Sequence, residues 1–210
     1  MAHNIYSLII LDRSGSMSSV RKETVDNVNE TLGTIRAAAR KHPGSKHYVS
    51  LLAFCGCTMQ YIFELDEITK IKNITQADYE PCCTTPLHDA IGLACTRLHK
   101  VAAADHEANV SVTIITDGYE NASKEWNNRE IKKLIELYRS EGWLFTYIGA
   151  DHDVEKVAMT LSINNTLVFE KTAQAMPAMS RRVCACRSSW LDDASERKCS
   201  EEDNAGFFSR

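Results

Sequence analysis

The stretch LIILDRSGSMSS, residues 8–19, is an apolar run that stops abruptly at an acidic residue. The run begins at Ile5, and its continuous apolarity is typical of a strand that is covered on both faces of a sheet. Short polar side chains then follow at alternating positions, namely Asp12, Ser14 and Ser16. Alternate residues of an extended chain point the same way, so these three side chains can converge on one point. The stretch therefore predicts a buried strand that opens into a polar loop.

Similar apolar runs recur along the chain, at 48–54, 110–116, 143–149 and, in a shorter form, 166–170. Segments with helical periodicity separate them, at about 25–39, 85–98, 124–140 and 154–161. This alternation predicts an α/β fold with a doubly wound, mostly parallel sheet. The run at 59–65 follows its predecessor after a turn that is too short for a parallel crossover, which predicts one antiparallel edge strand.

The alternating pattern ends near residue 175. We expect residues 1–175 to form one domain, since 210 residues suffice for a single core with a tail. From 176 onward the sequence has scattered charge and no strand pattern. We expect residues 176–210 to form a last helix followed by a weakly ordered tail.

Composition excludes several classes of function. The net charge of −4 and the absence of a long basic run argue against nucleic-acid binding. No apolar run approaches the ~20 residues that span a bilayer, so we expect no membrane partner. The apolar run at 5–11 has no basic leader and no small-residue cleavage site, which favours a cytoplasmic protein. The sequence does not indicate an oligomeric state.

The acidic and hydroxyl side chains that could bind a metal ion lie where strands of the predicted sheet end. Parallel strands end on one rim, so Asp12 and Asp117 should lie close together, with Ser14 and Ser16 beside them. Such a set of oxygen atoms suits Mg²⁺ or Mn²⁺ better than Zn²⁺, which prefers nitrogen and sulfur. Mg²⁺ is coordinated by six oxygen atoms, more than this loop supplies. We therefore expect water and a carboxylate from a protein partner, an Asp or Glu side chain, to complete the coordination.

Three segments, DRSGSM (12–17), TTPLHDA (84–90) and ITDGYEN (115–121), together resemble the von Willebrand factor A domain and its metal-ion-dependent adhesion site. The resemblance covers about residues 4–170 and includes the later run TDGYENASKEW…GWLFTYIGADHD, which looks like small bacterial and phage members. It implies a Rossmann-like fold, a metal held by Asp12, Ser14, Ser16, Thr85 and Asp117, and metal-dependent binding of a protein. An intracellular bacterial or phage role is implied by analogy alone.

The sequence departs from the family pattern at one place. Members commonly have Gly-Gly before Thr-Pro-Leu, where this chain has Cys83 and Thr84. We assign the metal to Thr85 rather than Thr84 because Thr85 stands directly before Pro86. For partner contacts the candidates are three rim residues, Arg13, Tyr119 and Asp151.

Two other functions remain as alternatives to metal-dependent binding. One is a structural or adaptor module with a degenerate site, which binds through its tail or its cysteine-bearing rim. The other is a phosphatase-like enzyme, which we disfavour because Ser14 stands where such enzymes need a second acid. The sequence also lacks a G-x-x-x-x-G-K-[ST] loop and a G-x-S-x-G elbow. We therefore expect no enzymatic activity.

The cysteines form a second pattern on the rim. If the strand at 48–54 is parallel to the first, Cys55 and Cys57 emerge beside Asp12, and the chain returns there at Cys82 and Cys83. Four sulfurs would then lie near one another. Because neither C-x-C nor C-C matches the usual C-x₂₋₄-C spacing, reduced thiols are the favoured expectation, with a zinc cluster or a redox pair as the alternative.

Overall fold

A computed structural model describes residues 3–150, 153–169 and 175–209 of the chain. Its sheet has six strands in the order β3-β2-β1-β4-β5-β6. The strands are β1 (Asn4–Asp12), β2 (Lys46–Cys55), β3 (Thr58–Glu67), β4 (Asn109–Thr116), β5 (Leu144–Ala150) and β6 (Asn165–Phe169). All neighbouring strands are parallel except β2 and β3, which pair antiparallel. The predicted α/β fold with one antiparallel edge strand is confirmed.

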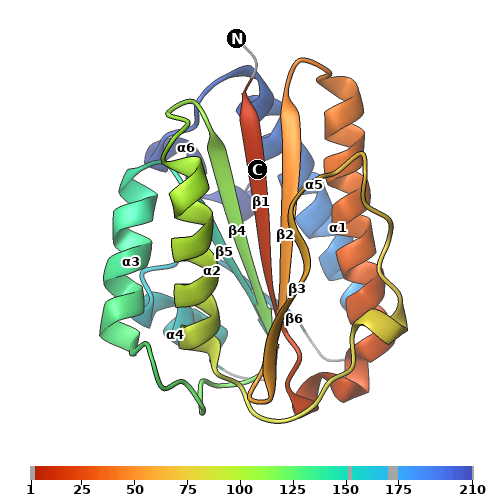
Figure 1. The fold of residues 1–210 in the computed structure, drawn as a ribbon, viewed down its shortest axis with the longest axis vertical. Coiled ribbons are helices and arrows are strands. Elements are labelled where there is room, and N and C mark those ends of the chain that lie inside the picture. The colour runs from red at the N-terminus through yellow and green to blue at the C-terminus, as the bar shows by residue number, and fades with distance from the viewer. Residues whose placement is uncertain (1–2, 151–152, 170–174, 210) are drawn as a thin grey trace.

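Helices cover both faces of this sheet (Figure 1). They are α1 (Arg21–Lys41), α2 (Leu87–Ala102), α3 (Asn128–Ser140), α4 (Val154–Thr160), α5 (Ala175–Glu196) and α6 (Glu201–Asn204), with short 3-10 turns η1 (Gly15–Val20), η2 (Gln76–Asp78) and η3 (Phe207–Ser209). Ile5, Ile9 and Leu11 of β1 pack in one core with α1 and α5. Leu8 and Ile10 pack in the other, with α2, α3 and α4. This two-sided burial explains why β1 is apolar without interruption.

The third helix begins later than the sequence predicts. We expected helix from about residue 124, but α3 starts at Asn128. The backbone amides of residues 124–126 instead donate to the carboxylate of Asp89, and Asn127 and Glu130 form a capping box. The carboxylate of a residue in α2 therefore supplies the hydrogen-bond acceptors that a preceding turn of the same helix would otherwise provide.

The C-terminal segment is ordered as far as residue 209. Trp190 of α5 is fully buried, and Phe207 and Phe208 of η3 join the core that α1 and α5 share. The side chain of Asn204 accepts from Trp190 Nε1 at 2.8 Å and donates to the backbone oxygen of Gly142 at 2.9 Å. The expectation of a weakly ordered tail is therefore wrong, because two aromatic side chains anchor the end of a charged stretch. The boundary at residue 175 stays a prediction.

None of the helices in the part of the chain that the structure describes combines the length and apolar character needed to cross a bilayer.

Candidate metal centre

Three loops meet at the lower edge of the sheet in Figure 1, where β1 and β4 end. The first follows β1 and runs into η1, the second leads into α2, and the third follows β4. Leu11 before the first loop and Met17 and Val20 after it are buried and anchor the loop, while Gly15 and Ser16 lie exposed just before Met17. The edge that holds the predicted acids is therefore built by apolar anchors on either side of short polar segments.

The carboxylate of Asp12 is fully buried and fixed from two directions. Its Oδ1 accepts a hydrogen bond from the backbone amide of Ser14 at 2.7 Å. Its Oδ2 accepts one from the hydroxyl of Thr116 at 2.6 Å. Asp12 and Thr116 end neighbouring parallel strands, in which Leu11 pairs with Ile115. Sheet register alone therefore brings them together, and each carboxylate oxygen keeps a lone pair for a further partner.

The hydroxyls of the first loop connect directly to the second acid. The Oγ atoms of Ser14 and Ser16 lie 3.1 Å apart. Ser16 Oγ donates to Asp117 Oδ1 at 2.6 Å, across a separation of 101 residues in the chain. Asp117 is only 5% exposed, whereas Ser16 lies on the surface. The polar chain therefore leads from solvent into the sheet edge.

Thr85 completes the cluster from the second loop. A Cβ added at Gly118 would lie 3.6 Å from Thr85 Oγ1 and 3.8 Å from Ser16 Oγ, so both hydroxyls border the same small space. The N-cap residue of α2 is Pro86, and no side-chain hydrogen bond caps the helix there. Thr84 is exposed and packs against Gly56, so the structure supports the choice of Thr85 for the cluster.

Residues around the cluster hold its loops in place. The backbone amide of Thr85 donates to the side chain of Asn121 at 2.8 Å, and the amide of Asn121 donates to the oxygen of Thr85 at 3.1 Å. The carboxylate of Glu120 accepts from the amides of His88 at 2.8 Å and Ser123 at 2.7 Å. The loop after β4 is thus hydrogen-bonded to the start of α2.

Sequence reasoning missed two supporting side chains. The hydroxyl of Thr116 holds Asp12, and the buried hydroxyl of Tyr79 donates to the backbone oxygen of Asp12 at 2.6 Å. Thr116 was detectable in principle, since it precedes Asp117 at a strand end that must lie beside the end of β1. Tyr79 lies in an irregular segment, and nothing in its local sequence indicates this contact.

Negative charge accumulates at this sheet edge. Burial raises the pKa of the Asp12 carboxyl above its ordinary value, against the lowering effect of the hydrogen bonds from Thr116 and Ser14, and the charge of Asp117 raises it further. Burial, followed by the charges of Asp12 and Asp117, raises the pKa of the Tyr79 phenol as well. A bound cation would relieve this repulsion between carboxylates.

The donor set fits a hard divalent cation. It contains the carboxylates of Asp12 and Asp117 and three hydroxyls, those of Ser14, Ser16 and Thr85, all of them oxygen ligands of the kind that Mg²⁺ and Mn²⁺ prefer. Gly118 leaves open the space between two of these hydroxyls. All five residues predicted from the sequence meet at one edge of the sheet.

The three predicted partner-contact residues differ in their surroundings. Tyr119 is 56% exposed beside the cluster. Arg13 is half-buried, and its guanidinium points to Cys55 Sγ at 3.9 Å rather than outward. Asp151 lies outside the described residues. Of the three, Tyr119 has the position expected of a contact residue.

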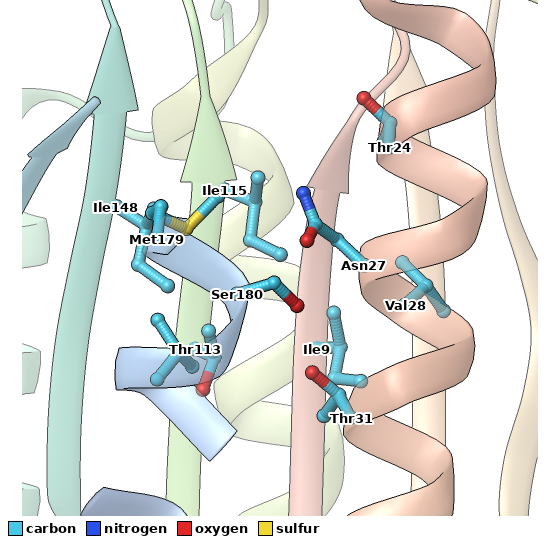
Figure 2. Close-up of a pocket in the computed structure, with 11 residues that line it drawn as sticks. Ile9, Thr24, Asn27, Val28, Thr31, Thr113, Ile115, Ile148, Met179 and Ser180 are labelled. Carbon is cyan, nitrogen blue, oxygen red and sulfur yellow. The ribbon is translucent and has the colours of Figure 1, made fainter. Parts of the chain in front are cut away.

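A cavity lies apart from the cluster, on the face of the sheet that α1 and α5 cover (Figure 2). Its lining is mainly apolar and includes Ile9, Val28, Ile148 and Met179. Its volume of about 20 Å³ is close to that of a single water molecule. The cavity is therefore a packing feature and is too small for a cofactor or substrate.

Comparison with known proteins identifies the fold. The family model of the von Willebrand factor type A domain matches residues 8–180. The vWF domain of the type V pili tip protein Mfa5 from Porphyromonas gingivalis is similar with a TM-score of 0.62 and 8% identity, over 94% of this chain and 98% of that one. The open conformation of the pilus adhesin SpaC from Lactobacillus rhamnosus GG gives a TM-score of 0.65 and 12% identity, over 93% of this chain and 30% of that one.

A von Willebrand factor type A protein from Catenulispora acidiphila gives a TM-score of 0.58 and 12% identity, over 92% of this chain and 43% of that one. The chain thus spans less than half the length of the SpaC adhesin and of the Catenulispora acidiphila protein. Identities this low show a shared fold alone. No curated protein matches the chain.

Proposed function

The chain belongs to the von Willebrand factor type A domain family, and we propose that it binds a protein partner through a divalent cation, Mg²⁺ or Mn²⁺, held at the end of β1 and β4. The cation would be held by Ser14, Ser16 and Thr85 together with Asp12 and Asp117. It would supply a positively charged centre with an open coordination position, which a partner's Asp or Glu side chain fills.

One observation carries this proposal. Ser16 Oγ donates directly to Asp117 Oδ1, with Thr85 Oγ1 beside the same Gly118, although the three segments are far apart in sequence. A turn whose serines merely cap a helix would not need an acid from another strand. The convergence of three loops on one oxygen-lined space is what a cation site requires.

The donor set also favours binding over catalysis. Ser14 stands where a phosphatase would have its general acid, and its hydroxyl instead contacts Ser16. The cluster holds no histidine, and its two acids are tied to hydroxyls by short hydrogen bonds. The chain's own residues therefore hold and orient a cation, and we propose no bond-making step. Two carboxylates only balance the charge of Mg²⁺, and the hydroxyl ligands are neutral. The occupied site therefore carries no excess negative charge, and an acidic partner group is the complementary ligand.

A peptide selection tests this proposal. The immobilised chain is exposed to a displayed library of random peptides in Mg²⁺, washed, and eluted with EDTA. The eluted peptides should be enriched in an Asp or Glu at a fixed position. The Ser16→Ala variant should lose this enrichment, while Ser18→Ala, an exposed serine in the same turn, should keep it. Equal enrichment from wild type and Ser16→Ala, or peptides that remain bound in EDTA, would refute the proposal.

A further inference from the structure

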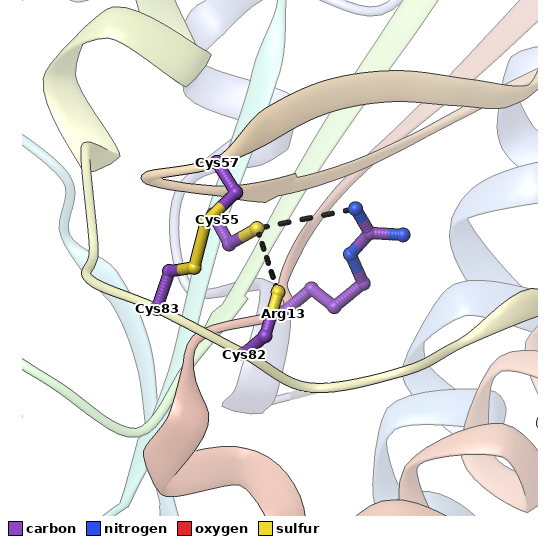
Figure 3. The surroundings of a disulfide bond; sticks show 5 residues. All are labelled: Arg13, Cys55, Cys57, Cys82 and Cys83. Carbon is purple, nitrogen blue, oxygen red and sulfur yellow. Dashed lines mark hydrogen bonds between the residues drawn. A yellow bond between two sulfur atoms is a disulfide. The ribbon is translucent and has the colours of Figure 1, made fainter.

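Four cysteine side chains form a compact cluster next to the metal centre (Figure 3). The Sγ atoms of Cys55, Cys57, Cys82 and Cys83 all lie within 4.8 Å of one another. Cys57 and Cys83 are joined by a disulfide, and Cys55 Sγ lies 3.4 Å from Cys82 Sγ. The expectation that all four are reduced thiols is wrong for the bonded pair. The expectation that the four sulfurs gather on the rim is confirmed.

We propose that these four cysteines bind one zinc ion as four thiolates once the Cys57–Cys83 disulfide is reduced. Two molecules of a small thiol supply the two electrons and two protons of that reduction and leave joined as their own disulfide. Zinc–sulfur bonds of ~2.3 Å in a tetrahedral site place the sulfurs about 3.8 Å apart. The observed limit of 4.8 Å between any two sulfurs accommodates this arrangement. Two separate disulfides would explain each pair, but they would not require both pairs to share one small volume. On binding, four thiols release four protons and zinc enters without any change of oxidation state.

The backbone explains how an unusual cysteine spacing can work. Cys55 ends β2 and Cys57 is the second residue of the two-residue turn before β3, so the chain reversal keeps the two residues close together. Adjacent residues in an extended chain face opposite sides, which would separate Cys82 from Cys83. Cys83, however, has a φ of 62°, a left-handed conformation that favours glycine. This turn brings its sulfur to the same point as that of Cys82.

The conformation of Cys83 also indicates a role for its sulfur. A residue with a side chain is strained in the left-handed region that Cys83 adopts. A glycine would relieve that strain, so the cysteine needs a compensating bond through its side chain. Either a disulfide or a metal supplies one.

The surroundings favour negatively charged sulfur. A zinc ion with four thiolates has a net charge of −2, and the guanidinium of Arg13 lies 3.9 Å from Cys55 Sγ. The backbone amides of Cys57 and Thr58 donate to that same sulfur.

The zinc site would hold the loops of the neighbouring metal centre. The amide of Cys82 donates to the backbone oxygen of Arg13 at 2.8 Å, and the amide of Gly15 donates to the oxygen of Cys83 at 3.1 Å. Gly56 N donates to the oxygen of Thr84 at 2.8 Å, and a Cβ at Gly56 would overlap the Thr84 side chain. With four protein ligands and no open position, the zinc would act structurally, by fixing the segments that flank Ser14 and the segment that precedes Thr85.

Cobalt titration of the reduced chain tests this inference. The protein is reduced with a phosphine, freed of metal with a chelator, and titrated anaerobically with Co²⁺ and then Zn²⁺. We expect one Co²⁺ per chain, with the visible and sulfur-to-metal absorption of a tetrahedral tetrathiolate, and its displacement by Zn²⁺. Cys55→Ser should abolish this spectrum, and Cys184→Ser, a half-buried cysteine outside the cluster, should retain it. Ser16→Ala should also retain it, which separates this site from the oxygen-lined centre.

A second measurement needs no variant. Zinc should protect Cys55, Cys57, Cys82 and Cys83 from alkylation in the reduced wild-type chain, as read by mass spectrometry, while Cys184 reacts at an unchanged rate. The inference is overturned if the reduced wild type gives no tetrathiolate spectrum, or if zinc leaves the alkylation of the four cysteines unchanged.

Discussion

Because His47 is a buried histidine, we expect the folded state to lose stability at acidic pH. This side chain lies on β2, is only 1% exposed, and neither of its ring nitrogens has a hydrogen-bond partner among the described residues. Burial, with a smaller contribution from the charge of His42, lowers the pKa of His47 from 6.5 to about 4. The folded chain therefore holds this imidazole neutral at a pH where the unfolded chain protonates it.

The sign and size of the effect follow from linkage. Between pH 6.5 and about 4 the unfolded state binds more protons at His47, so stability falls as the pH falls through this window. The pKa difference corresponds to a loss of about 2 kcal/mol between pH 7 and pH 5, and of about 3 kcal/mol in total below pH 4. Above pH 7 His47 contributes no pH dependence.

Urea unfolding at pH 7 and pH 5 measures this loss for three proteins. Wild type contains the contribution of His47 together with that of all other groups. In His47→Leu the difference in unfolding free energy between the two pH values should shrink by about 2 kcal/mol. His106→Leu, at an exposed position, should leave it unchanged. If His47→Leu shows the same pH dependence as wild type, the reasoning about a buried neutral imidazole is wrong.

Three further substitutions test the packing. Gly33→Ala in α1 should raise the free energy of unfolding by about 0.5–1 kcal/mol, since its Cβ meets nothing within 4 Å. Gly92→Ala should lower the free energy of unfolding by about 1–3 kcal/mol, because the new methyl group overlaps the Trp126 indole. Equal stability of the Gly33→Ala and Gly92→Ala variants in denaturant unfolding would contradict both predictions. Arg187→Met should raise the free energy of unfolding by about 1 kcal/mol, because a buried guanidinium with no ion pair among the described residues is removed. Thr113 loses its hydrogen bond from Arg187 in this variant but keeps the one from the hydroxyl of Thr146. A melting temperature far below that of wild type would refute this account.

Much of the fold follows from local sequence. Unbroken apolar runs such as 5–11 predict strands covered on both faces, and the short turn after Cys55 predicts the antiparallel edge. The start of α3 was not predictable, because the carboxylate of Asp89 on another helix decides it. The order of the C-terminal segment was not predictable either. It depends on where Phe207 and Phe208 pack, which is a tertiary contact.

The candidate site was more predictable than its supports. Asp12 ends β1 and Asp117 directly follows the neighbouring strand β4, so topology alone brings them together, and spacing brings Ser14 and Ser16 to them. The contacts of Thr116 and Tyr79 with Asp12 depend on side-chain direction and on an irregular loop, which periodicity does not encode. The left-handed conformation of Cys83 was likewise hidden, although its place in a glycine position was a signal.

Calorimetric titration with Mg²⁺ tests the central claim most directly. Metal-free wild type should bind one Mg²⁺ per chain, and Ser18→Ala should bind it equally well. Ser16→Ala removes the hydroxyl that contacts both Ser14 and Asp117, and should weaken binding by at least about tenfold. Equal Mg²⁺ affinity in all three proteins, or no binding by wild type, would contradict the assignment of a metal centre to this edge of the sheet.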